Sequence, residues 1–106
     1  MRIRIQNYIK LFFKVLELNG CEALTDICFE RVAKQLPKLT VLKLDWCFKV
    51  TETGLDSLAA HCKRLSYVSM RSTGLKALPF SLSRLIYLNH LDIADCVSLM
   101  FPDRKV

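Results

Sequence analysis

Five cysteines and two histidines are the side chains of this 106-residue chain that could bind a metal or act as nucleophiles. A zinc site usually needs closely paired ligands, such as two cysteines separated by two residues, and the sequence contains no such pair. A nucleophilic cysteine needs a neighbouring base, and nothing in the sequence places His61 or His90 beside a thiol in a pocket. His61 and Cys62 are adjacent, which leaves a metal role only as the minor alternative. We therefore expect no metal and no cofactor.

Three of the cysteines recur at one position of a repeated pattern. Cys21, Cys47 and Cys96 each end a segment that alternates apolar and polar residues. Side chains at one repeat position form a column when repeats stack, so we expect buried thiols that donate weakly to backbone carbonyls. Disulfides are not expected, because packing already explains the spacing and free thiols suit a reducing compartment.

Other catalytic patterns are missing from the sequence, which has no paired carboxylates, phosphate-binding glycine loop or Ser/His/Asp set. We expect no enzymatic activity. The net charge of +6 is shared equally between the two halves, and no nucleic-acid-binding motif accompanies it. No apolar run approaches the roughly 18 residues that span a bilayer, and Lys10, Lys14 and Glu17 interrupt the apolar stretch near the start. The sequence predicts a cytoplasmic or nuclear protein without a nucleic-acid or membrane partner.

Four segments have the period-2 alternation of strands with one buried face. They cover residues 15–21, 41–47, 67–73 and 90–96, at spacings of 26, 26 and 23 residues. The residues predicted to face inward are Leu16, Leu18, Leu42, Leu44, Val68, Met70, Leu91 and Ile93. One such unit cannot bury its apolar face alone, so the units are expected to stack into a parallel sheet.

Two of the connections between these segments have helical periodicity. Residues 27–36 and 54–62 each place four apolar residues on one face: Phe29, Val32, Ala33 and Leu36 in the first, and Leu55, Leu58, Ala59 and Cys62 in the second. Thr25 and Asp26, and Thr51 and Thr53, precede these segments as candidate N-caps. In the third connection, Pro79 predicts no more than one or two turns of helix.

This pattern resembles leucine-rich repeats of the cysteine-containing type. The second repeat matches the motif at Leu39, Leu42, Leu44, Cys47, Val50, Thr51, Glu52, Gly54, Leu55, Leu58, Ala59 and Cys62. The first repeat matches from Cys21 to Ala33 but has Cys28 where the family usually has glycine, and the third resembles the shorter 23-residue class, with Thr73 in place of the cysteine. The resemblance implies an α/β fold, a right-handed solenoid of about four repeats with a parallel sheet on its concave face and helices or short helical turns on its convex face.

The resemblance also implies a function and a division of the chain. Cysteine-containing repeats are best known in F-box/LRR proteins, which are substrate receptors of ubiquitin ligases and whose repeats bind the substrate. We expect residues 1–12 to form a lead-in or cap, too short for an F-box, and 13–106 to form a repeat domain with repeats near 13–38, 39–64, 65–87 and 88–106. A protein partner is therefore expected, with the ubiquitin-ligase machinery reached only through a longer parent protein.

The outward strand positions are the candidate site. Outward residues of stacked strands align in columns, with neighbours about 4.8 Å apart. The four predicted columns are Val15, Val41, Tyr67 and His90; Glu17, Lys43, Ser69 and Asp92; Asn19, Asp45, Arg71 and Ala94; and Gly20, Trp46, Ser72 and Asp95. Two cross-strand ion pairs are expected, Glu17 with Lys43 and Asp45 with Arg71.

Exposed aromatic and aliphatic side chains on a sheet are typical of a binding hot spot, and lysine or arginine beside them could pair with acidic groups of a partner. The predicted protein-binding residues are Val15, Val41, Lys43, Trp46, Tyr67, Arg71 and His90. Two alternatives stay open. The outward residues could simply keep the strands in order, with Trp46 packed over a neighbouring strand. The chain could instead be a structural or assembly subunit that docks through its open ends, near Leu99 and Phe101.

Overall fold

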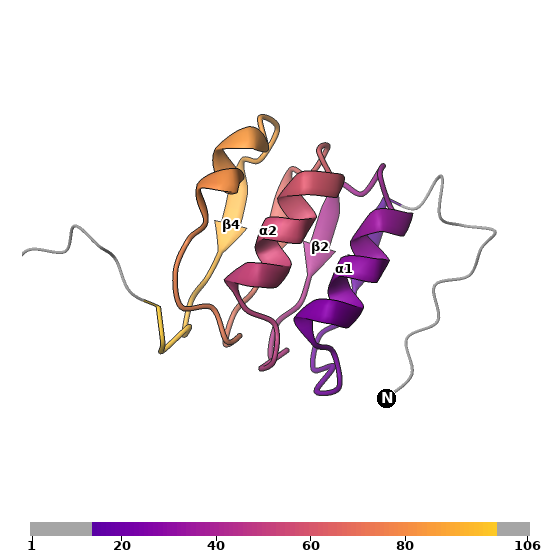
Figure 1. The fold of residues 1–106 in the computed structure, drawn as a ribbon. Helices are drawn as coiled ribbons and strands as arrows, with labels where there is room; N and C mark the ends of the chain where they lie inside the picture. Colours follow the sequence, from indigo (N-terminus) through magenta and orange to yellow (C-terminus); the bar gives the residue numbers. More distant parts are fainter. Residues whose placement is uncertain (1–13, 100–106) are drawn as a thin grey trace, which may run out of the picture.

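The structure, a computed structural model, describes residues 14–99 and is an α/β fold with an all-parallel sheet (Figure 1). Its four strands pair in sequence order: β1 (Val15–Glu17), β2 (Val41–Lys43), β3 (Tyr67–Ser69) and β4 (His90–Asp92). The register aligns the first residues of the four strands, as the first two predicted columns require. The predicted lead-in or cap, residues 1–12, and Phe101 lie outside the described residues.

Two helices, α1 (Asp26–Gln35) and α2 (Glu52–His61), lie side by side against one face of the sheet (Figure 1). Both threonine N-caps are confirmed, because Thr25 Oγ1 accepts the N–H of Cys28 at 3.4 Å and Thr51 Oγ1 accepts that of Thr53 at 3.2 Å. Each helix begins directly after its threonine, one or two residues earlier than predicted. The first helical residues are Asp26 and Glu52, and a negative charge there is stabilised by the positive end of the helix dipole.

The third connection contains only a 3-10 helix, η2 (Phe80–Arg84), in the position that the α-helices occupy in the first two repeats. Its N-cap residue is Pro79, which has an extended backbone (ψ 149°) and provides no side-chain hydrogen bond to the helix. The predicted short helical segment is thus confirmed. None of the helices in residues 14–99 has the length and apolar character needed to cross a membrane.

The core lies between the sheet and the helices. The predicted inward residues Leu42, Leu44, Val68 and Met70 are fully buried, as is Phe29 from α1. Nearer the two ends of the stack, Leu16 is still buried, but Leu18, Leu91 and Ile93 are only partly buried, because the described residues provide no further strand beyond β1 or β4. The apolar alternation therefore identified the core, and burial is deepest in its two middle repeats.

A partly buried carboxylate links the first two repeats on the helix side. Asp26 Oδ1 accepts the backbone N–H groups of Thr51 (2.8 Å) and Gly54 (3.1 Å), and Asp26 Oδ2 accepts the Thr51 hydroxyl at 2.5 Å. A Cβ atom on residue 54 would lie 2.5 Å from Asp26 Oδ1, so only glycine allows this approach. The side chain of Asp26 in α1 therefore satisfies free amides at the start of α2.

Candidate protein-interaction surface

The first residues of the four strands form a row across the face of the sheet that the helices leave uncovered. This sheet row consists of Val15, Val41, Tyr67 and His90. The Tyr67 and His90 rings stack with centroids 4.1 Å apart and an angle of 4° between planes, while the Lys43 ammonium lies 5.8 Å from the Tyr67 ring centroid. The row thus presents valine side chains beside an aromatic stack, and Val15 is 44% exposed.

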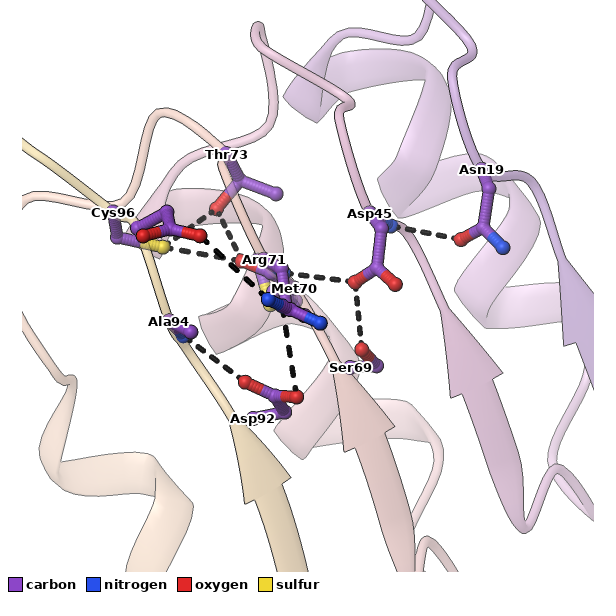
Figure 2. A network of polar contacts seen from close by, with 10 residues as sticks. Asn19, Asp45, Ser69, Met70, Arg71, Thr73, Asp92, Ala94 and Cys96 are labelled. Atoms are coloured by element: carbon purple, nitrogen blue, oxygen red, sulfur yellow. Dashed lines mark hydrogen bonds and ion pairs between the residues drawn. The ribbon is translucent and has the colours of Figure 1, made fainter.

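Polar groups occupy the middle of this face, and one predicted ion pair is wrong. Lys43 lies 3.4 Å from Glu17, as expected. The Arg71 guanidinium instead lies 3.8 Å from Asp92 of β4 (Figure 2) and 3.7 Å from Asp95, which follows β4. Lys43 and Arg71 were predicted to pair with acidic groups of a partner, but both already lie beside carboxylates of this chain.

Asp45 has a different role from the one predicted. Its Oδ1 accepts the backbone N–H of Arg71 at 2.9 Å and the hydroxyl of Ser69 at 2.6 Å (Figure 2). In the preceding repeat, Asn19 Oδ1 accepts the backbone N–H of Asp45 at 2.9 Å. These bonds continue the pairing of neighbouring repeats beyond the short strands. One expectation is corrected here: Ser69 was predicted to be an outward residue, but its side chain is only 3% exposed.

The last predicted column has an unusual backbone. Gly20, Trp46, Ser72 and Asp95 all have positive φ, at 74°, 67°, 57° and 61°. This left-handed conformation costs a non-glycine residue roughly 1–2 kcal/mol. Glycine adopts it without that cost, and Gly20 occupies this position in the first repeat. Trp46 adopts it while its N–H donates to Arg71 O at 2.8 Å. A large aromatic residue held in a strained conformation is a feature that clusters at functional sites.

Trp46 lies at an open groove of about 300 Å³, which we call the turn groove. Its lining residues are Trp46, Phe48, Ser72, Thr73, Asp95 and Val97. The Trp46 and Phe48 rings meet edge to face with centroids 6.0 Å apart, and the two side chains are 55% and 54% exposed. Ser72, predicted as an outward residue, is instead buried at the groove wall. The groove is an apolar surface left open to solvent, the kind of surface that often marks an interaction site.

The predicted site is therefore two surfaces. Tyr67 and His90 belong to the sheet row, where the strands begin, whereas Trp46 follows β2 by three residues and belongs to the turn groove. The sequence reasoning missed Phe48 and Val97, which line the groove. The available signal was that each directly follows a cysteine of the repeated column, so the two share one repeat position.

The cysteines of the predicted column, Cys21, Cys47 and Cys96, are buried packing residues, as predicted, and so is Cys62. The Cys47 thiol donates to Leu18 O at 3.0 Å and the Cys96 thiol to Met70 O at 3.1 Å, while Cys62 lies 3.3 Å from Leu36 O. Burial raises the pKa of Cys47 and raises that of Cys62 to about 12. No disulfide joins the five cysteines, all of which lie within residues 14–99. Within residues 14–99, no three His, Cys, Asp or Glu side chains gather to hold a metal.

The exposed Cys28 should be the reactive thiol of the folded chain. Hydrogen bonding to Thr25, and the nearby charge of Arg31, lower its pKa, whereas Cys21, Cys47, Cys62 and Cys96 are buried. Because the thiolate is the nucleophile, we expect mass spectrometry to find one rapid iodoacetamide adduct per native chain and five adducts after denaturation. The Cys28→Ser variant should show no rapid adduct. Two or more rapid adducts in the native chain would contradict the buried column.

The parallel sheet, the helices on one of its faces and the column of buried cysteines are features of a repeat region of the leucine-rich type. The chain is 34% identical over 55 residues to F-box/LRR-repeat protein 12 of Arabidopsis thaliana. The match covers 52% of this chain and 14% of the relative, so the similarity is distant and partial. No protein-family model matches the chain. The similarity supports the resemblance to leucine-rich repeats and suggests a protein-interaction repeat.

Proposed function

We propose that this chain is a leucine-rich-repeat module that binds a partner protein. In this proposal, residues 13–106 form a right-handed solenoid of four repeats, and the partner contacts both the sheet row on the open sheet face and the turn groove. The observation that carries the proposal is Trp46, exposed in a left-handed conformation beside Phe48 at an open apolar groove. Exposed aromatic side chains beside a pocket are typical of the residues that dominate binding energy at interfaces.

The distant relative suggests the setting in which such binding would operate. Its name joins an F-box to leucine-rich repeats, and this chain would correspond to substrate-recognition repeats, with ubiquitin ligation reached only through a longer parent protein. The role that we propose for the exposed rings is binding, without an enzymatic activity. Four buried cysteines outside any disulfide suit the reducing compartment that this proposal assigns, the cytoplasm or nucleus.

A pulldown from lysate with mass spectrometry tests this proposal. We expect the Trp46→Gly/Tyr67→Ala variant to lose at least one protein that the unchanged chain captures. The variant should keep its fold, because glycine suits the left-handed position that Gly20 occupies in the first repeat. Phe80→Ala is the matched control, since Phe80 is 98% exposed on η2, away from both surfaces. Identical partner lists for all three chains would refute binding through this face.

A second candidate function is an assembly subunit that docks through the end of the stack at β4. Leu91, Ile93 and Leu99 favour it, because they pack on the core but stay partly exposed. In the same pulldown, loss of partners with Leu99→Asp but not with Trp46→Gly/Tyr67→Ala would support this candidate over the first.

A further inference from the structure

The two edges of the sheet differ in charge. Helices end and strands begin at one edge, the upper one in Figure 1, which is made by residues 34–40, 60–66 and 83–90. These segments contain no acidic residue and five cations: Lys34, Lys38, Lys63, Arg64 and Arg84. All five are exposed, and we call them the basic edge. The opposite edge mixes cations with carboxylates such as Glu22, Asp45, Glu52 and Asp95.

Within residues 14–99, most cations of the basic edge have no counter-charge. Lys34 pairs with Glu30 at 3.6 Å, but no described residue forms an ion pair with Lys38, Lys63, Arg64 or Arg84. On the sheet face, by contrast, Lys43 and Arg71 both form ion pairs with carboxylates. Cations near a helix C-terminus favour the helix dipole within its last turn, which accounts for Lys34. Lys38, Lys63 and Arg64 lie beyond that last turn, in the connections to the next strands.

The basic edge adjoins the sheet row. Val15, Val41 and Tyr67 are the first residues of their strands, and Lys14, Lys38 and Arg64 lie one to three residues before them. Exposed or half-buried apolar side chains, and cations that form no ion pair with a described residue, therefore lie along the same margin of the sheet. Complementary potentials across an interface steer association and select partners.

From this charge complementarity we propose, building on the proposed function, that the margin formed by the basic edge and the sheet row binds an acidic segment of a partner protein. Its carboxylates would face Lys38, Lys63 and Arg64, and its apolar side chains would contact Val15 and Val41. A nucleic acid fits less well, because binding of single strands relies on aromatic faces on which bases stack. The Tyr67 ring is occupied by His90 from β4 and by Lys43 from β2, the strands on either side.

Fluorescence anisotropy with the full chain tests this inference. The probe is a short labelled peptide that alternates glutamate and valine, and the variant is Lys63→Glu/Arg64→Glu. We expect this variant to bind about ten-fold more weakly than the unchanged chain, and the binding of the unchanged chain to weaken as salt rises past about 0.15 M. The matched control is Arg31→Glu/Lys49→Glu, which changes net charge equally at exposed cations away from the basic edge. Its affinity should change less than about two-fold.

Three outcomes would overturn the inference. Equal weakening by both double variants would mean that only net charge matters, and no weakening by Lys63→Glu/Arg64→Glu would remove the basic edge from binding. Tighter binding of a labelled oligothymidine than of the peptide, lost in the same variant, would make this margin a nucleic-acid surface. Because the peptide assay is independent of the pulldown, either proposal can fail alone: partners can still be lost with Trp46→Gly/Tyr67→Ala while the peptide fails to bind.

Discussion

Replacement of Phe29 by alanine is expected to lower the free energy of unfolding by about 3–5 kcal/mol. Phe29 is 1% exposed and is the largest fully buried side chain. It projects from α1 toward α2, where its Cδ2 atom would lie 3.2 Å from a Cβ atom on Gly54. Its removal leaves a cavity between two rigid helices, and that cavity cannot close without moving them. Urea denaturation followed by circular dichroism measures the loss.

Phe80→Ala is the control for this measurement, because it deletes the same side chain at a fully exposed position. It should change the free energy of unfolding by less than about 0.5 kcal/mol. A loss below about 1 kcal/mol for Phe29→Ala would mean that α1 does not pack against α2 as the structure shows. A small domain has roughly 5–15 kcal/mol of stability in total, so the expected loss is a large part of it.

Asp26→Ala is the second large effect, with an expected loss of about 2–4 kcal/mol in the free energy of unfolding. The substitution removes the Asp26 oxygens that accept the Thr51 N–H and the Thr51 hydroxyl, and it leaves the Gly54 N–H with Thr51 O alone at 3.1 Å. These groups are partly buried, so their hydrogen bonds to a charged oxygen are not fully replaced by bonds to water. The same urea denaturation measures the loss.

Asp26→Asn separates the hydrogen bonds from the charge. Its amide oxygen can still accept the backbone N–H of Thr51, while its amide nitrogen can donate to the Thr51 hydroxyl. We therefore expect about half the loss caused by alanine. Equal losses for Asn and Ala would show that the negative charge dominates, and no loss for Ala would contradict the link between the first two repeats.

The repeated elements were predictable because each depends on local spacing. Alternation at Leu42 and Leu44, helical spacing at Leu55 and Leu58, and the Thr51 cap each follow from a few consecutive residues. The cysteine column was also predictable, since equal spacing along the chain becomes stacking in space. The parallel sheet, the two helices and the buried thiols of the structure all agree with these predictions.

The surface was harder to predict because it depends on choices between near neighbours. Arg71 has carboxylates on both adjacent repeats, and the sequence does not show which way its side chain points. In the structure the guanidinium forms ion pairs with Asp92 and Asp95, whereas Asp45 accepts only the backbone N–H from Arg71. The left-handed backbone at Trp46 is not evident from a tryptophan, a residue that rarely adopts it. The turn groove joins Trp46 to Val97, which are two repeats apart in the sequence, so no single segment reveals it.

Site-specific photo-crosslinking is the measurement that tests protein binding by the open sheet face most directly. A benzophenone amino acid placed in turn at positions 46, 67 and 80 would be activated in lysate, and the adducts would be identified by mass spectrometry. We expect a common partner to crosslink from position 46 in the turn groove and position 67 in the sheet row, but not from position 80 on η2. Adducts only from position 80, or none from positions 46 and 67, would contradict recognition through this face.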